Sequence, residues 1–377
     1  MIKKFFSVLV VAIVIVACSS SDDGGGNNGG GVDPTFDRQA LLTNLADNII
    51  IPAFQDFQTK LNALDVARGN FVNDISQSNL DTLSAAWLDA YKAWQYVQMY
   101  TIGPAEPIIG VDDRGFVSFF NIFPVTTSLI ENAAETGSYD LSTVDYHPGR
   151  GLPALDFLIH GLVSGDASAI DKFTTNQDAS GYIDFLTDVT SQMINLTNTI
   201  VSGWENTSRD SFVNNTANSI NGSLNKIVND YILYYESGFR KDKFGTPAGN
   251  FSIDPLPEKV EAFYKNDVSK ELALEAMTAI EDLFNGRAFN GGAAGPSFKT
   301  YLEFLDRSDL VTAINTQLST ARSMISSLDN SFYNQVINDN TQMTQAYDAI
   351  QACVPLLKTD MAQALNIAID FNDADGD

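Results

Sequence analysis

Residues 78–97 read Ser-Asn-Leu-Asp-Thr-Leu-Ser-Ala-Ala-Trp-Leu-Asp-Ala-Tyr-Lys-Ala-Trp-Gln-Tyr-Val, and their apolar members recur every three or four positions. This spacing lines one face of a helix, as in helical bundles, with Leu80, Leu83, Trp87, Tyr91, Trp94 and Val97. Ser78 and Asp81 resemble a capping box in which Asp replaces Glu, and Gly103-Pro104 is a stop signal. The stretch therefore predicts a long helix that packs along one side.

Helical periodicity continues through most of the remaining chain, and no convincing run of alternating strand residues occurs. Long helices with one apolar face are predicted at residues 182–204, 212–234, 310–328 and 332–369. Pro355 should bend the last of them. We therefore expect an all-α protein of two helical-bundle domains of the up-and-down type, residues 36–206 and 207–377, with long loops at their interface. A duplicated bundle is an interpretation from size and pattern alone, because the halves show no residue-level repeat.

The N-terminus predicts export and lipid anchoring. Lys3 and Lys4 precede the apolar run Phe5–Ala17, which is too short to span a bilayer and fits a signal peptide of residues 1–17. Ile15-Val16-Ala17-Cys18 resembles a lipobox, so Cys18 is the predicted lipidation site, with an uncleaved anchor as the alternative. Residues 18–35 then read as a flexible Gly/Asn/Ser/Asp tether. We expect a cell-envelope, outer-membrane lipoprotein that faces either the periplasm or the cell surface.

Charge and cysteine content exclude several classes of protein. The chain carries 47 Asp and Glu against 22 Lys and Arg, a formal net charge of −25. Such a surface repels nucleic acid and anionic membranes, so no nucleic-acid partner is expected. Once Cys18 is lipidated, Cys353 is the only remaining thiol, which excludes an intramolecular disulfide and favours a small core residue.

Residues 150–161, Arg-Gly-Leu-Pro-Ala-Leu-Asp-Phe-Leu-Ile-His-Gly, combine several features of a short helix with polar residues on one face. Pro153 suits a first helical turn, and Gly161 suits a stop. Asp156 and His160 stand four apart and so share a face. Asp156 is read either as a site carboxylate or as a charge serving the helix N-terminus. The plainer interpretation is a buried helix with a solvated Asp–His pair.

Two irregular segments are expected near the same region. Residues 102–125 form a long loop that contains Glu106, Asp112 and Asp113, although an Asp-Asp pair is more often a simple turn. Residues 240–249 form a second loop, which either lines a pocket or connects two helices tightly. A helix is predicted to restart over residues 258–263.

Known hydrolase motifs are missing from the sequence. No His-Glu-x-x-His occurs, and His147 and His160 are the only histidines, so a three-histidine zinc site is impossible. No Gly-x-Ser-x-Gly elbow occurs either, and a serine hydrolase would have to use one of these two histidines.

Three stretches resemble the imelysin family, bacterial proteins also called iron-regulated protein A-like and placed among the peptidases as family M75. The first runs from Ala86-Trp87 through Trp94 to Gly103-Pro104. The second is the stretch at 150–161, which resembles the family signature Gly-x-His-x-x-Glu. The third is Lys-Phe-Gly-Thr-Pro-Ala-Gly at 243–249, followed by residues 257–264. The resemblance implies two helical domains, a site between them and a role linked to iron uptake.

The sequence departs from the family signature at the two positions that would supply metal ligands. Gly151 is kept, but Pro153 stands at the histidine position and Asp156 at the glutamate position. Gln98 stands where many relatives carry an acid. A proline side chain offers no ligand atom, so a cation here would need oxygen partners, which favour hard cations over zinc. Asp156 is the best metal candidate, with weaker ones at Glu106, Asp112, Asp113 and His160.

The resemblance and the residues together define the expected site and function. Ligand-binding residues are expected at Gly151, Pro153, Asp156, Trp94, Gln98, Lys243, Phe244, Gly245 and Thr246. We expect a non-enzymatic binding lipoprotein associated with iron uptake, with an envelope protein as partner and with iron or another cation left open as cofactor. The alternatives are a metal-dependent peptidase and a surface structural or interaction protein that has lost the ancestral metal site.

Overall fold

The computed structural model describes residues 35–108 and 112–371, without the side chains of residues 112–114. The predicted signal peptide, Cys18 and nearly all of the tether lie outside this part, as do the side chains of Asp112 and Asp113. Within it, the only β contact is an isolated antiparallel bridge between Arg287 and Ala294. The prediction of an all-α protein is confirmed.

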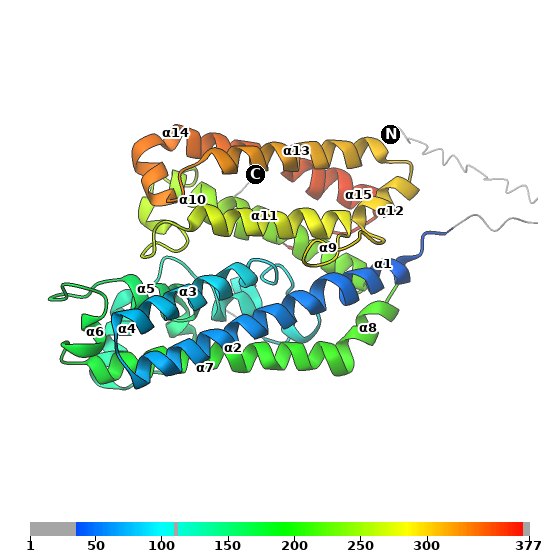
Figure 1. The fold of residues 1–377 in the computed structure, drawn as a ribbon. Helices are drawn as coiled ribbons and strands as arrows, with labels where there is room; N and C mark the ends of the chain where they lie inside the picture. Colours follow the sequence, from blue (N-terminus) through cyan, green and yellow to red (C-terminus); the bar gives the residue numbers. More distant parts are fainter. Residues whose placement is uncertain (1–34, 109–111, 372–377) are drawn as a thin grey trace, which may run out of the picture. The chain divides into compact units, whose positions relative to one another are not determined.

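The first half of the chain forms one group of helices (Figure 1). Its members are α1 (Arg38–Asn44), α2 (Ile51–Asn73), α3 (Gln77–Trp94), α4 (Thr127–Thr136), α5 (Gly151–His160), α6 (Asp171–Thr174), α7 (Ala179–Gly203) and α8 (Arg209–Asn214). Helix α2 packs along α3 and α7, and α5 contacts both α3 and α7. The short helix α5 is therefore held inside the group, and nine of its ten residues are buried.

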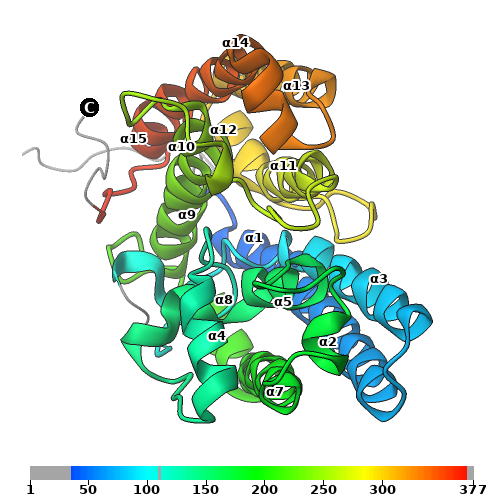
Figure 2. The same ribbon diagram turned by 90° about the vertical axis from the view of Figure 1, so that its left-hand side faces the viewer.

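The second half forms another group (Figure 2). It contains α9 (Ser223–Leu233), α10 (Thr246–Ala248), α11 (Ser269–Asn285), α12 (Phe298–Phe304), α13 (Ser308–Ser327), α14 (Phe332–Gln351) and α15 (Ala362–Ala364). Helix α13 packs on α11 and α14, while α11 reaches across to α3. Residues from Phe36 onward form one compact unit. The division into domains 36–206 and 207–377 stays a prediction.

Several local expectations are wrong. Helix α3 begins at Gln77, so Ser78 lies inside it and makes no capping box. The segment expected as a loop at 240–249 is instead the end of a π-helix, η6 (Tyr234–Gly245), followed by α10 and a turn at Gly249 with φ of 85°. π-Helical turns are rare in proteins, and those that occur often lie at functional sites. The last stripe is broken into α14, the π-helix η8 (Leu356–Met361) and α15.

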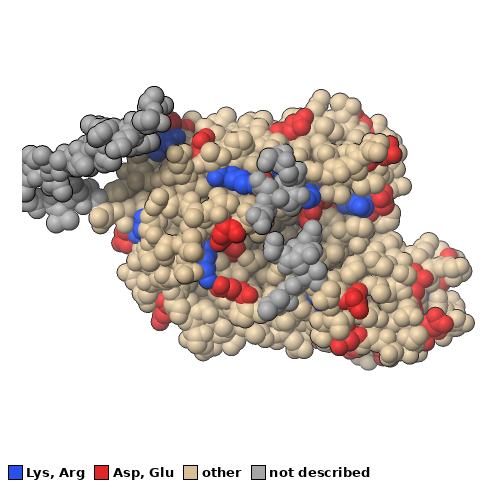
Figure 3. Space-filling view, turned by 180° about the vertical axis from the view of Figure 1, so that it is seen from behind, with Lys and Arg blue, Asp and Glu red and all other residues tan. Residues whose placement is uncertain are grey.

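The outer surface agrees with the acidic composition. Figure 3 shows Asp and Glu side chains spread over both halves of the face seen there. Cys353 is buried, as expected for a core thiol, and burial raises its pKa to about 12. No helix within residues 35–108 and 112–371 combines the length and apolar character of a bilayer span.

Candidate functional site

The carboxylate of Asp156 fastens a distant segment of the chain. It lies in α5, and its side chain is 2% exposed. Its Oδ2 accepts the backbone N–H of Tyr264 and its Oδ1 accepts that of Lys265, both at 2.9 Å. Nδ1 of His160 lies 2.9 Å from the same Oδ1. Hydrogen bonds to an ionised acceptor are strong, so Asp156 anchors residues 264–265 instead of capping its own helix or standing solvated.

The anchored segment is not the helix expected over residues 258–263. Only Pro257–Lys259 forms a 3-10 turn, and Ala262 and Asn266 have positive φ angles of 57° and 68°. Such angles are costly for residues other than glycine and persist only where the surroundings hold them. Here Asp156 holds one end of the segment, and the side chain of Glu261 is held at the other.

Glu261 is the centre of a buried polar cluster. The ammonium of Lys243 donates to its Oε2 and, at 2.8 Å, to Oε1 of Gln95. Oε1 of Glu261 accepts Nδ2 of Asn121 at 2.9 Å and Nε2 of Gln95 at 3.3 Å. Lys243 and Glu261 side chains are each 2% exposed. Because both charges are buried, each depends on the other and on the amides around them.

The charged pair and the neutral side chains around it form one buried group. We call it the Lys243–Glu261 cluster, and its members are Tyr91, Gln95, Gln98, Asn121, Tyr234, Lys243 and Glu261. Nε2 of Gln98 donates to Oε1 of Gln95 at 2.6 Å and to the hydroxyl of Tyr234 at 2.7 Å. The hydroxyl of Tyr91 donates to Oδ1 of Asn121 at 2.6 Å. The cluster therefore joins α3 and the turn after it to η6 and to residue 261.

Burial and the carboxylate shape the titration of this cluster. Burial lowers the pKa of Lys243, and Glu261 opposes that shift. Burial, followed by the charge of Glu261, raises the pKa of Tyr91 and of Tyr234 well above the usual phenol range. Both tyrosines therefore stay protonated at neutral pH: the hydroxyl of Tyr91 donates to Asn121, and the hydroxyl of Tyr234 accepts from Gln98.

Comparison with known proteins identifies the family. The model of the imelysin family, peptidase M75, matches residues 50–359. The chain belongs to the imelysin family. The structure resembles an imelysin-like protein from Psychrobacter arcticum 273-4, at 16% identity and a TM-score of 0.68, with 89% of this chain and 97% of that chain covered. No curated protein matches the sequence.

A second solved structure is similar to the same extent. It is described as an iron-regulated protein A precursor from Parabacteroides distasonis ATCC 8503, at 17% identity and a TM-score of 0.68. Here too 89% of this chain and 97% of that chain are covered. At such low identities the two structures support the imelysin fold, and the family prediction is confirmed.

The three imelysin-like stretches meet around residues 261–265. Gln98 belongs to the first stretch, just after α3, and Asp156 belongs to the second, the signature. Lys243 is the first residue of the third stretch. Sequence reasoning singled out these three but missed Glu261, Gln95 and Asn121. A signal for Glu261 existed, since one acid stands among Val260, Ala262 and Phe263 in an otherwise apolar run.

Other predicted site residues lie in packed surroundings outside the Lys243–Glu261 cluster. The ring of Trp94 stacks on Phe120 at 4.9 Å, and its buried indole N–H has no hydrogen-bond partner among the described residues. Pro153 is buried inside α5, and Phe244 packs between Phe239 and Phe332. Gly245 admits no side chain, because a Cβ would lie 2.5 Å from Phe251 and 2.7 Å from Tyr347. Thr246 is half-buried at the start of α10.

The residues at the signature do not fit a metal ion. Pro153 has no ligand atom, and the carboxylate oxygens of Asp156 are occupied by two backbone N–H groups and His160. Glu106 lies on the surface, 2.6 Å from Nζ of Lys226. Within the part of the chain that the structure describes, no three His, Cys, Asp or Glu residues gather as a metal site. We therefore derive no chemical step through a metal.

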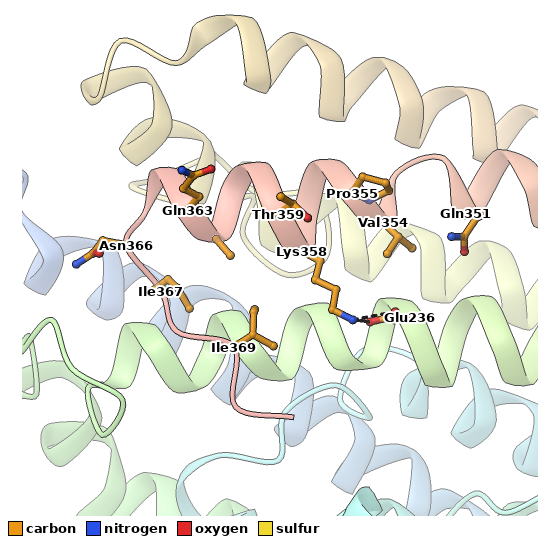
Figure 4. A pocket seen from close by; sticks show the side chains of 11 residues that line it. Glu236, Gln351, Val354, Pro355, Lys358, Thr359, Gln363, Asn366, Ile367 and Ile369 are labelled. Atoms are coloured by element: carbon orange, nitrogen blue, oxygen red, sulfur yellow. Dashed lines mark hydrogen bonds and ion pairs between the residues drawn. The ribbon is translucent and has the colours of Figure 1, made fainter. Parts of the chain in front are cut away.

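A cavity lies away from the Lys243–Glu261 cluster. It has a volume of about 760 Å³ and is bounded by η6 and the C-terminal segment (Figure 4). Glu236 and Lys358 form an ion pair of 3.1 Å at its wall, and Val354, Ile367 and Ile369 supply apolar surface. None of the ligand-binding or metal-binding residues predicted from the sequence lines this cavity.

Proposed function

We propose that this imelysin is a lipid-anchored binding protein of the cell envelope that takes part in iron uptake, and that it does not act as a metallopeptidase. The observation that carries the proposal is the converted signature, in which Pro153 has no ligand atom and Asp156 is used to hold residues 264–265. The iron-uptake role is supported by family membership and by the relative described as an iron-regulated protein A precursor.

The proposed ligand site lies beside the Lys243–Glu261 cluster, between the two groups of helices. Buried charged groups with shifted pKa values are more frequent at functional sites than elsewhere. Lys243 and Gln98 belong to that cluster, and Gly245 and Thr246 directly follow Lys243. An envelope protein that handles iron is the proposed partner.

Growth under iron limitation tests this function. A strain that lacks the gene should grow more slowly in chelated medium, and either the wild-type chain or added iron should restore growth. Cys18→Ser should restore growth poorly and lose incorporation of a labelled fatty acid, whereas Cys353→Ala, the control at the other cysteine, should keep both. Equal growth of the deletion and parent strains in chelated medium would contradict the iron-uptake role. A chelator-sensitive cleavage of denatured protein would instead favour the peptidase.

A further inference from the structure

Three residues from two helices of the first group form a connected chain of hydrogen bonds. Oγ of Ser84, in α3, lies 2.7 Å from Nε2 of His160, the last residue of α5. Nδ1 of the same imidazole lies 2.9 Å from Oδ1 of Asp156. The hydroxyl and the carboxylate thus contact opposite nitrogens of one ring. This is the arrangement in which a carboxylate orients a histidine that activates a serine.

Asp156, the acid of this hydrogen-bonded series, and His160, its base, are held firmly by their neighbours. Asp156 is fixed by the backbone N–H groups of Tyr264 and Lys265, so its carboxylate cannot turn away from the ring. The Trp87 indole and the imidazole pack in an edge-to-face arrangement, with ring centroids 4.9 Å apart. The carboxylate of Asp156 and the Trp87 ring together orient His160.

The hydroxyl of Ser84 differs from most hydroxyls in the helices of this protein. Thr82, Thr187 and Thr190 each donate to the carbonyl four residues earlier, as is usual for hydroxyls inside a helix. For Ser84, the hydrogen bond within the described residues is the one to His160. In the tautomer whose Nδ1 donates to Asp156, Nε2 accepts the hydroxyl proton of Ser84.

A substrate has access to this hydroxyl. Ser84 and His160 line a cavity of about 390 Å³, together with Leu80, Ile159 and Lys265. The side chain of His160 is 13% exposed, whereas that of Asp156 is 2% exposed. Ser84 and His160 thus reach solvent through the cavity, whereas Asp156 stays buried. A substrate can therefore contact the nucleophile and the base, while the acid only orients the base.

We propose that Ser84, His160 and Asp156 form a hydrolytic site for small carboxylic esters. Oγ of Ser84 attacks the ester carbonyl carbon as Nε2 of His160 accepts the hydroxyl proton. The carbon–oxygen bond to the alcohol breaks, and the alcohol leaves with that proton, so that an acyl group remains on Ser84. A water molecule then attacks the acyl carbon, gives its proton to Nε2, and releases the carboxylic acid as Ser84 recovers its proton.

The position of Ser84 limits how the negative charge on the ester oxygen is stabilised. Backbone N–H groups in the middle of α3 are used by the helix, so α3 itself supplies no backbone donor to the ester oxygen. The ammonium of Lys265 belongs to a residue that lines the same cavity, and it lies 2.8 Å from Oδ1 of Asp267. Stabilisation by one ammonium predicts slow turnover and a preference for esters with good leaving groups.

This inference stands apart from the proposed function, because it concerns the cavity beside Ser84 and not the Lys243–Glu261 cluster, and it needs no iron. It also differs from the metallopeptidase alternative, since the nucleophile is a side chain of the protein. A purely structural role for the three residues makes the opposite prediction, namely stability without any reactivity at Ser84.

A fluorophosphonate probe and p-nitrophenyl acetate test the site in the purified full chain. The probe should label the peptide that contains Ser84, and Ser84→Ala should lose the label and at least about tenfold of the ester hydrolysis. His160→Gln should lower both to a similar degree. Ser78→Ala, an exposed serine in the same helix, should match the wild type. Circular dichroism should show that all four proteins are folded.

Two results would overturn the inference. One is ester hydrolysis in Ser84→Ala equal to that of the wild type. The other is a folded wild-type protein whose Ser84 peptide carries no label after prolonged exposure to the probe. Because Ser84→Ala removes a single half-buried oxygen, it should fold normally and leave the readout interpretable.

Discussion

At the scale of single residues, this protein places two opposite charges in its interior and surrounds them with amides. Lys243 and Glu261 are buried together, Gln95 hydrogen-bonds to both, and Asn121 donates to Glu261. A buried pair of this kind contributes little net stability compared with apolar residues, but removing one partner leaves an uncompensated charge. The pair therefore determines how the cluster is arranged more than how stable the protein is.

Single and double substitutions separate the net contribution of the pair from the cost of leaving one buried charge unpaired. We expect Glu261→Gln to lower the free energy of unfolding by about 3 kcal/mol, because the ammonium of Lys243 then lies buried without its counter-charge. The double variant Lys243→Met with Glu261→Gln should recover a substantial part of that loss. Urea denaturation at pH 7 measures both. Losses that simply add would show that the two charges act independently.

A second buried lysine, Lys172, predicts how the stability of the protein depends on pH. Lys172 is fully buried, its ammonium donates to the carbonyl of Gly161, and burial lowers its pKa to about 8. Between pH 8 and the usual lysine value of 10.5, the unfolded chain binds the proton that the folded chain has lost. The free energy of unfolding should therefore rise with pH across this window, by up to about 3 kcal/mol.

The variant Lys172→Met isolates this contribution, because it keeps the length of the side chain and removes the titrating group. Urea denaturation of both proteins at pH 7.5 and pH 10 is the measurement. We expect the stability of the wild type to increase relative to Lys172→Met over this range. A constant difference between the two proteins would rule out the lowered pKa.

At the scale of elements, α5 depends on a close approach of two backbone segments. Gly151 begins the helix with φ of 75°, and a Cβ there would lie 2.3 Å from the carbonyl oxygen of Phe120. The N–H of Leu152 donates to that same oxygen at 2.7 Å. Asn121 follows Phe120 directly, so this contact also positions a member of the Lys243–Glu261 cluster.

Two glycine substitutions distinguish backbone strain from steric exclusion. Gly137 ends α4 with φ of 62°, but a Cβ there would meet nothing within 4 Å. We expect Gly137→Ala to cost about 1 kcal/mol for the left-handed conformation alone. Gly151→Ala should cost about 3 kcal/mol or more, because the backbone must also separate from Phe120. Thermal unfolding of both variants checks this, and equal costs would contradict the close approach.

At the scale of the whole molecule, buried and surface contacts join the two groups of helices. The Lys243–Glu261 cluster and the Asp156 anchor both cross between them, and Nζ of Lys92 lies 2.6 Å from Glu271 and 3.6 Å from Glu275 at the surface. Half-exposed ion pairs contribute less than about 1 kcal/mol, so the buried contacts should dominate the coupling.

Unfolding should therefore be a single transition. Trp87, Trp94 and Trp204 all lie in the first group, so tryptophan fluorescence reports on that group, while far-ultraviolet circular dichroism reports on both. We expect the two urea curves to coincide in the wild type and in Lys92→Ala. Glu261→Gln should begin to separate them. Separate midpoints in the wild type would instead support two independent domains.

The sequence by itself determined the helical fold and the family. Apolar periodicity is a local property, so stripes such as Leu80 to Trp94 could be read directly, and so could Gly151 and Pro153 of the signature. Local patterns failed at residues 258–263, where a helix was expected. There Asp156 and the Lys243–Glu261 cluster hold the chain in turns that no nearby residue requires.

Only the tertiary structure decided which polar groups meet. Glu261 contacts Gln95 across 166 positions of the sequence and Asn121 across 140, and Ser84 contacts His160 across 76. The spacing of Asp156 and His160 predicted that they share a face, but it contained no information on Ser84. Contacts of this kind depend on how α3, α5 and residues 261–265 pack, and packing is set by the whole apolar core rather than by the residues that come into contact.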